Sequence, residues 1–447
     1  MRDIPSYEIL NTCVKCGLCL PTCPTYRLTL REQSSPRGRI HLMQAVSESR
    51  LSVLDATFVD QMYECLDCRA CEAVCPSGVR YGEVIEAARA QVEHARVASR
   101  RRGIAETLLR RAVFEGVLAN MSLLRSLAAL LRFYQCGGLR TAVRRLGLLR
   151  LLHLERLERQ APELGARFFV PRDQRFPAEG ERRGRAALHA GCVMHVAFAE
   201  IDRATIRVLT RNGWEVIVPA SQGCCGALHV HAGEAAGGRA RARANIAAFE
   251  AAEVDVVVSN AAGCGAALKE YGVLLQDEPA WAERAAAFSA RVRDLTELLA
   301  SAPMRGDLKS LNRTVTYQDP CHLAHAQRVA AAPRALLRQI PGLELVEMQE
   351  TALCCGSAGI YNLTHPEMSA RLLAGRVTQV LETGADIVAT ANPGCMLQLR
   401  NGLLSSRPPA GKPIGVRHVV ELLDSAYGGG SPLPGASAPS PFGRELG

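Results

Sequence analysis

Two runs of closely spaced cysteines near the N-terminus have the spacing of a bacterial two-cluster ferredoxin. Each run has the form Cys-x-x-Cys-x-x-Cys-x-x-x-Cys-Pro, over residues 13–24 and 65–76. In that arrangement, three cysteines of one run and the fourth cysteine of the other run bind each cluster. The spacing therefore predicts two [4Fe–4S] clusters, the first bound by Cys13, Cys16, Cys19 and Cys75 and the second by Cys65, Cys68, Cys71 and Cys23.

A structural zinc module is the alternative for the same cysteines. Zinc usually takes its four ligands as separated pairs, and two repeats of a four-cysteine run followed by proline do not fit that arrangement. Between the runs, residues 40–64 have an amphipathic helical pattern, so a mainly α-helical domain is expected. The segment 34–40 is expected to be a turn that carries Arg37 and Arg39. These arginines either dock a partner or raise the reduction potential of a cluster, or the turn is simply a solvated loop.

A second set of cysteines lies in an internal duplication. Its members match in pairs at a nearly constant offset of 129 to 131 residues, which is typical of a repeated unit. Each copy contains a Cys-Cys-Gly sequence, and we call the copies the first and second Cys-Cys-Gly modules. The thiols of the first module are Cys192, Cys224, Cys225 and Cys264, and those of the second are Cys321, Cys354, Cys355 and Cys395.

Each of these cysteines closely follows a short apolar run, and helical runs such as 195–211, 234–251 and 366–382 come between the apolar ones. This alternation predicts βαβ units and a parallel sheet, with the cysteines gathered beyond the carboxyl ends of the strands. The expected strands are 186–190, 215–220 and 254–260 in the first module and 314–318, 343–348 and 385–392 in the second.

Four thiols in each module can hold a further cluster or another metal, or can carry out thiol–disulfide exchange. The alternative is that all eight are buried structural cysteines. Several histidines lie near them in the sequence and are candidates for ligands or proton carriers, or for supporting and surface positions. They are His195, His229, His231, His322 and His325. Cys136 has no partner pattern and is expected to be inert.

The composition, with 48% hydrophobic and 22% charged residues among 447, is that of a soluble globular protein of about three domains. No apolar run is long enough for a membrane span, and the N-terminus lacks a secretory pattern, so a cytoplasmic location is expected. In that reducing compartment, 17 cysteines indicate metal or redox chemistry rather than disulfides.

The expected fold is multidomain, with an N-terminal, mainly α-helical two-cluster ferredoxin domain and duplicated α/β modules with parallel sheets. The expected boundaries are 1–98 for the ferredoxin-type domain, 99–184 for a basic helical linker, 185–305 and 306–425 for the two Cys-Cys-Gly modules, and 426–447 for a disordered tail rich in glycine, proline and serine.

The linker carries the whole excess of positive charge. Residues 99–160 contain 13 Arg and 4 Glu without Lys or Asp, which equals the net charge of +9 of the entire chain. Leucines recur there at helical spacing, for example at Leu123, Leu127 and Leu131. A basic amphipathic helix can lie on an anionic membrane or pack on a partner subunit. Nucleic-acid binding is not expected, because aromatic residues make up only 5% and no recognition motif is present.

No GxGxxG sequence follows a predicted strand and no P-loop is present, so a nucleotide site is not indicated. The chain therefore shows electron carriers without a hydride acceptor, and a flavin or nicotinamide is expected on another subunit.

The chain resembles the iron–sulfur subunit of bacterial glycolate oxidase over roughly residues 8–425. The resemblance implies a complex with two FAD-binding subunits that oxidise glycolate to glyoxylate. Electrons would then pass through the [4Fe–4S] clusters to an acceptor such as membrane quinone, at the cytoplasmic face of the inner membrane. The motifs that carry the resemblance are CVKCGLCLPTCPTY, SPRGRI, CLDCRACEAVCPSGVRYG, GCCGALHVH, AGCGAALKEYG, LCCGSAGIYNLTHP and ANPGC.

The alternatives are the iron–sulfur subunit of a related lactate or glycerol-3-phosphate dehydrogenase and a heterodisulfide-reductase-like thiol enzyme. In the heterodisulfide reductase B subunit, each module ends in CxxC. Here Cys264 is followed by Gly-Ala-Ala and Cys395 by Met-Leu-Gln. Each module therefore lacks a fifth thiol, which argues against a five-thiolate cluster and against direct disulfide reduction and leaves a four-thiolate site open.

Overall fold

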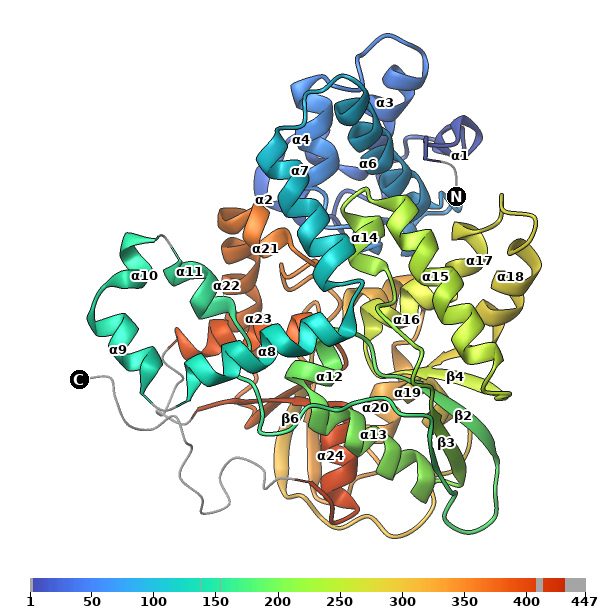
Figure 1. The fold of residues 1–447 in the computed structure, drawn as a ribbon, viewed down its shortest axis with the longest axis vertical. Helices are drawn as coiled ribbons and strands as arrows, with labels where there is room; N and C mark the ends of the chain where they lie inside the picture. Colours follow the sequence, from blue (N-terminus) through green and yellow to red (C-terminus); the bar gives the residue numbers. More distant parts are fainter. Residues whose placement is uncertain (1–2, 137, 153, 407–412, 431–447) are drawn as a thin grey trace.

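The structure is a computed structural model that describes residues 3–136, 138–152, 154–406 and 413–430 (Figure 1). Most of the predicted disordered tail, residues 431–447, lies outside the described residues. Figure 1 shows the N-terminal helices at one end of the molecule and the β-sheets at the other, with the helices that follow residue 99 along one side.

All regular elements of the N-terminal region are helices, as predicted. Phe58, Met62, Val84 and Ile85 form its fully buried core, together with some of the cysteines. The elements are α1 (Tyr7–Asn11), α2 (Pro24–Thr29), the 3-10 turn η1 (Glu32–Ser34), α3 (Pro36–Ser47), α4 (Ala56–Glu64), α5 (Ala70–Ala73) and α6 (Tyr81–Ala98).

The segment 34–40, which we predicted to be a turn, is instead the start of α3. The side chain of Ser35 accepts a hydrogen bond from the Gly38 N–H and Pro36 occupies the first helical turn, a combination that starts a helix well. Its two arginines differ, because Arg37 is partly exposed whereas Arg39 is completely buried. The interpretation of this segment as a solvated loop is therefore wrong for Arg39.

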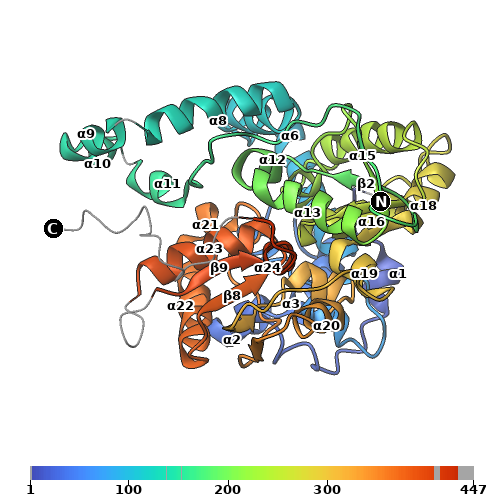
Figure 2. The same ribbon diagram turned by 90° about the horizontal axis from the view of Figure 1, so that it is seen from below.

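The next region is helical and contains α7 (Ile104–Arg110), the π-helical η2 (Arg111–Val117), α8 (Met121–Gln135), α9 (Leu139–Arg145), α10 (Leu148–Leu151) and α11 (Glu155–Gln160). Figure 2 shows α8, α9 and α10 reaching outward along one side of the molecule. Within the described residues, no single helix is long and apolar enough to cross a membrane. One pair of helical segments has the length and composition of a span only when the two are taken together, and these segments, Ile104–Val117 and Met121–Gln135, are bent by 102° to each other.

The first Cys-Cys-Gly module contains a sheet of five strands in the order β1-β3-β2-β4-β5. All neighbouring pairs are parallel except β1, which pairs antiparallel with β3. The elements are β1 (Gln174–Phe176), β2 (Gly184–His189), α12 (Val193–Ala197), α13 (Ala199–Arg211), β3 (Trp214–Val218), α14 (Ala227–His231), α15 (Ala235–Glu250), β4 (Val256–Ser259), α16 (Ala262–Lys269), α17 (Tyr271–Leu274), α18 (Ala282–Arg291), β5 (Val292–Asp294) and α19 (Leu295–Ala300).

The second module repeats this order in an all-parallel sheet, β7-β6-β8-β9. The predicted strands and the parallel βαβ pattern are confirmed in both modules, and the short strands β1, β5 and β9 are additions. The elements are β6 (Arg313–Tyr317), η3 (His322–Ala326), α20 (Ala331–Leu337), β7 (Leu343–Val346), α21 (Tyr361–Thr364), α22 (Pro366–Glu382), β8 (Ile387–Thr390), α23 (Pro393–Leu404), β9 (Gly415–His418) and α24 (Val419–Ala426).

The two modules share one hydrophobic core. Residues of both sheets, such as Leu188 and Val388, belong to the same buried cluster. Polar contacts join them as well, since the Ala262 N–H donates to the Ala391 carbonyl at 3.0 Å and Arg207 pairs with Asp424 at 2.7 Å. The carboxyl ends of the two sheets are therefore held in a fixed relation.

Candidate redox centres

The first predicted cluster ligands meet around one cavity. Cys13, Cys16, Cys19 and Cys75 all line a cavity with about 420 Å³ of atom-free space. Cys16 is exposed and the other three are partly buried, so this cavity lies near the surface. Cys75, from the second run, therefore lies at the same cavity as three cysteines of the first run.

The second predicted set lines a neighbouring cavity, whose walls include Cys23, Cys65, Cys68 and Cys71. All four of these cysteines are buried. Cys71 lines both cavities. Burial raises the pKa of the Cys65, Cys68 and Cys71 thiols, so they carry protons until a metal binds and displaces them.

Several polar groups contact the sulfurs of the second set. The Tyr81 hydroxyl donates to Cys65 Sγ at 3.7 Å, and the Asp67 N–H donates to the same atom at 3.4 Å. Arg39 lines the cavity with its completely buried side chain. Hydrogen bonds to cluster sulfurs and nearby positive charge are the features that tune iron–sulfur clusters. At least four thiols line each of the two cavities, and thiol donors fit an iron–sulfur cluster.

The thiols of the first Cys-Cys-Gly module also converge. Cys192 follows β2, Cys224 and Cys225 follow β3, and Cys264 lies in the first turn of α16. Hydrogen bonds with Cys192 and Cys225 hold the pKa of the Cys224 thiol well below its usual range, and Cys225 also bonds with Cys264. The four sulfurs therefore form one connected group at the carboxyl edge of the sheet.

The second module has the same arrangement. The Cys355 thiol donates to Cys395 Sγ at 3.5 Å, and Cys354 hydrogen-bonds with both Cys355 and Cys321. Asn392 donates its side-chain N–H to Cys395 Sγ at 3.5 Å. The contacts with Cys354 and Cys395 hold the pKa of Cys355 well below its usual range, while the pKa values of Cys354 and Cys395 themselves are raised by their thiol neighbours and by burial. Four soft sulfur donors in one group suit a soft metal or a cluster.

The glycine after each cysteine pair is required by the turn. Gly226 and Gly356 have φ values of 85° and 84°, in the left-handed region that favours glycine. A Cβ atom at Gly356 would lie 2.8 Å from the carbonyl oxygen of Ser369. The turn presents both cysteines of each pair to the same set of thiols.

The second module lies directly against the second ferredoxin-type cavity. Cys68, Cys321 and Cys354 belong to one buried apolar cluster, together with Leu66 and Tyr361. The first module is covered differently, because Cys192 and Cys224 are buried beneath Phe114 and Leu118 of the linker region. The sequence does not predict this difference between the two copies.

The candidate histidines take different roles. His322 Nδ1 lies 3.5 Å from Cys321 Sγ. His229 Nε2 lies 3.0 Å from the Phe114 carbonyl oxygen, and His229 also helps to lower the pKa of Cys224. His195 and His325 contact the backbone carbonyls of Gly191 and Ala352, respectively. His231 contacts Asp67 and Glu86 of the N-terminal region, and its ring lies 5.4 Å from that of His322 in the second module.

Some residues at these sites were missed in the sequence. The sequence indicates Arg39 as one of two arginines of a turn that could raise the potential of a cluster, but not its burial, and it does not indicate Asp67, Asn392 or Arg376. Arg376 is 2% exposed and donates to the carbonyl of Glu350 at 3.0 Å. Arg39 and Arg376 reach their sites through tertiary packing, whereas Asp67 and Asn392 contact cysteines two and three residues away in the sequence.

Matches to family models cover most of the chain. Residues 9–79 match the 4Fe-4S dicluster domain, and residues 186–269 and 315–400 both match the cysteine-rich domain. Residues 105–161 match the linker region of the glycolate oxidase iron–sulfur subunit. The family matches thus follow the order of regions seen in the structure.

Three curated relatives show how far the similarity extends. The "Probable glycolate oxidase iron-sulfur subunit" of Bacillus subtilis (strain 168) is 40% identical and covers 94% of both chains. The "Glycolate oxidase iron-sulfur subunit" of Escherichia coli (strain K12) is 34% identical over 95% of this chain and 96% of its own. "Lactate utilization protein A" of Bacillus licheniformis is 32% identical, but over only 54% of this chain and 99% of its own. From the ferredoxin-type cysteines through the linker to the second module, the chain belongs to the family of glycolate oxidase iron–sulfur subunits.

Proposed function

We propose that this chain is the electron-transfer subunit of a complex that oxidises glycolate to glyoxylate. The observation that carries the proposal is that the two predicted cysteine quartets line two neighbouring cavities, the second of which adjoins the thiols of the second module. The names and full-length similarity of two relatives support glycolate as the substrate of the complex.

The ligands in this proposal are the two quartets in full. Cys13, Cys16, Cys19 and Cys75 hold one [4Fe–4S] cluster, and Cys65, Cys68, Cys71 and Cys23 hold the other. A bound cluster supplies one-electron redox chemistry. Around the second quartet, Tyr81 and Asp67 donate hydrogen bonds to sulfur, Arg39 supplies positive charge, and burial excludes water.

The contact between Cys68 and the second module extends the route for electrons. Cys321 and Cys354 pack against Cys68, so we propose that the second module is the next centre after the second cluster. We further propose that the four thiols of each Cys-Cys-Gly module hold a metal or a cluster. The first module lies beneath the linker, so it would then be the redox centre nearest to the membrane or subunit that the linker binds.

We propose the same division of the chain that the sequence suggests, with residues 1–98, 99–184, 185–305, 306–425 and 426–447 as the ferredoxin-type domain, the linker, the two modules and the tail. FAD would be bound by two partner subunits, since no dinucleotide-binding sequence is present in this chain. A quinone in the membrane would be the acceptor.

Protein purified without oxygen and reconstituted with iron and sulfide is expected to be brown. Two [4Fe–4S] clusters give broad absorbance near ~400 nm and about eight irons per chain, and iron beyond that number would belong to the Cys-Cys-Gly modules. Iron analysis and electron paramagnetic resonance (EPR) of the reduced protein measure this. Colourless protein that contains zinc would contradict the proposal.

The substrate is tested on the complex, because substrate would not touch this chain. The chain is co-purified with its partners and assayed with an artificial electron acceptor against glycolate, lactate and glycerol 3-phosphate. Oxidation of glycolate in preference to the others supports the proposal. A preference for lactate would favour the function named for the partial relative from Bacillus licheniformis.

The linker is the surface that we propose to lie on the cytoplasmic face of the inner membrane. On α8, Ala128 is buried and Leu124 partly buried, whereas Leu130 and Phe133 are 65% and 73% exposed. The region has 13 Arg against 4 Glu over residues 99–160. Exposed apolar side chains among arginines complement a membrane surface that carries anionic lipids.

The double substitution Leu130→Glu and Phe133→Glu is expected to weaken binding to vesicles that contain anionic lipid by at least ~10-fold. Burying one large apolar side chain contributes ~1.5–3 kcal/mol, and ~1.4 kcal/mol corresponds to tenfold. Flotation with the vesicles measures binding, and Leu30→Glu, an exposed leucine outside the linker, is the matched control. If the double variant still floats but no longer co-purifies with the flavoproteins, the surface binds a partner subunit instead.

A further inference from the structure

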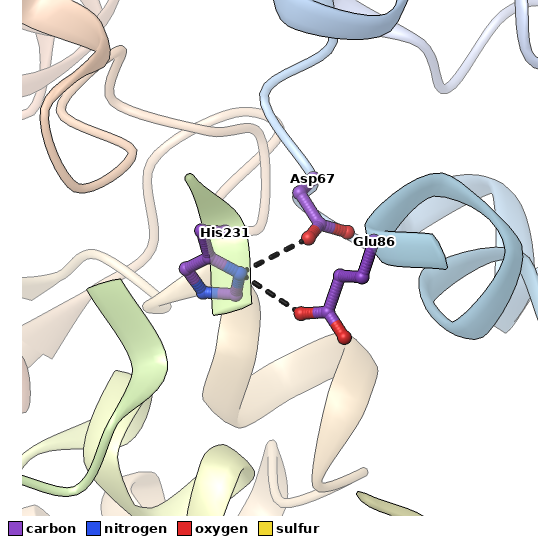
Figure 3. Close-up of side chains that lie close together, drawn as sticks. All are labelled: Asp67, Glu86 and His231. Carbon is purple, nitrogen blue, oxygen red and sulfur yellow. Dashed lines mark hydrogen bonds and ion pairs between the residues drawn. The ribbon is translucent and has the colours of Figure 1, made fainter. Parts of the chain in front are cut away.

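Three ionisable side chains that the proposed electron route does not use meet between the ferredoxin-type domain and the first module (Figure 3). They are Asp67, Glu86 and His231. His231 Nδ1 lies 2.9 Å from Glu86 Oε1 and 3.2 Å from Asp67 Oδ2. The candidate ligand atoms of all three residues lie within 4.8 Å of one another. Two oxygens and one imidazole nitrogen therefore face the same small volume.

Rigid elements position all three side chains. Asp67 lies in the cysteine loop between Cys65 and Cys68, Glu86 lies within the long helix α6, and His231 is the last residue of α14. Arg89, on α6, donates to the carbonyls of Met62 and His231 at 3.0 and 2.9 Å, and to that of Cys65. These bonds join the cysteine loop, α6 and α14 around the three side chains.

Asp67 is 3% exposed, and its carboxylate forms an ion pair with His231 at 3.2 Å. Among the described residues, neither of its oxygens accepts a hydrogen bond of good geometry. Both oxygens of this buried carboxylate can therefore accept a further ligand. Nearby Arg69 is already engaged with Glu72 and Glu270, at 2.7 and 2.6 Å.

Positive charge is strongly favoured at His231 Nδ1. Burial lowers the pKa of His231, but its contacts with Asp67 and Glu86 raise it to about 10. Either a proton or a metal ion can supply that charge, and a metal must displace the proton to bind. In the protonated state the Nδ1–H faces the two carboxylates directly, whereas in the metal-bound state the ion would take the place of the proton and the carboxylates would bind the ion.

We propose that Asp67, Glu86 and His231 form a binding site for a divalent transition-metal ion such as Mn²⁺ or Zn²⁺, separate from the iron–sulfur centres. Carboxylate oxygens and imidazole nitrogen are accepted ligands of these ions. The side chain of His231 is 23% exposed, which gives the ion access from solvent. The bound ion would link the loop that holds the second cluster to the first module.

The test uses the full-length protein with both clusters loaded and oxidised. Mn²⁺ is the probe, because it prefers oxygen and nitrogen ligands to the thiols of the Cys-Cys-Gly modules. We expect EPR titration to show one Mn²⁺ bound per chain, displaced by Zn²⁺. Pulsed EPR of the bound ion is expected to show coupling to one histidine nitrogen, a readout that requires no variant.

Glu86→Gln and His231→Gln are each expected to weaken Mn²⁺ binding by at least ~10-fold. Glu93→Gln is the matched control, since Glu93 is also a buried glutamate on α6 but pairs with Arg102. Cluster absorbance shows whether each variant is folded. The proposal is overturned by wild-type protein that binds no Mn²⁺, by bound Mn²⁺ without histidine coupling, or by equal affinity in Glu86→Gln and Glu93→Gln. None of these outcomes bears on the electron-transfer proposal.

Discussion

Replacement of Cys68 by serine is expected to remove one [4Fe–4S] cluster and to reduce quinone-dependent turnover of the complex to background. Cys68 is buried, lines the second cavity and packs against Cys321 and Cys354 of the second module. It is therefore both a proposed ligand and the contact between two centres. Iron is expected to fall from about eight to about four per chain, because the other quartet remains complete.

The measurement that separates this effect from misfolding is flavin reduction in the assembled complex. Glycolate should still reduce the flavin of the partner subunits, because substrate oxidation does not depend on Cys68, while electrons no longer reach quinone. Cys136→Ser is the matched control, since Cys136 is an exposed cysteine that lies in neither quartet nor module. Unchanged quinone reduction by the Cys68→Ser complex would refute the proposed route.

The cysteine chemistry was predictable because it is encoded in local spacing. A run such as residues 13–24 brings three thiols together within one loop, whatever the rest of the fold does. The repeated Cys-Cys-Gly sequence was equally informative, because a cysteine placed just after each apolar run lies at the carboxyl edge of a parallel sheet. The six predicted strands are present because each is encoded by a local apolar run.

Short elements and long-range contacts were not predictable. Strands β1 and β5 have three residues each, too few for a period of two to be visible, and β9, with the sequence Gly-Val-Arg-His, contains no apolar run. Arg39 belongs to a polar segment, and only the packing of α2 and α4 around α3 buries it. The meeting of His231 with Asp67, and of Cys68 with Cys321, depends on how three folded regions pack together.

Arg39→Met is expected to destabilise the N-terminal domain by about 3 kcal/mol, at the lower end of the ~3–5 kcal/mol typical of breaking a buried ion pair. The Arg39 side chain is 1% exposed and pairs with Glu64 at 3.0 Å, and it also donates to the Gln61 carbonyl at 2.7 Å. Methionine fills similar space but leaves both acceptors without this donor. The lower end applies because Glu64 is 19% exposed and partly hydrated.

The same substitution is expected to lower the reduction potential of only one cluster. Arg39 lines the cavity of Cys23, Cys65, Cys68 and Cys71 but not that of the first quartet. A buried positive charge stabilises the reduced cluster, so its loss makes that cluster harder to reduce. Denaturant unfolding without oxygen and an EPR-monitored redox titration measure the two effects.

Arg50→Met is the control for both measurements. Arg50 is 54% exposed and pairs with Glu48 on the surface, where an ion pair contributes ~0–1 kcal/mol. The Arg50→Met variant should keep the stability and the cluster reduction potentials of the wild-type protein. If Arg39→Met were destabilised while both cluster potentials stayed at their wild-type values, Arg39 would act only in packing. In that case the polarity around the second cluster would have to come from Tyr81 and the Asp67 N–H, the two groups that donate to Cys65.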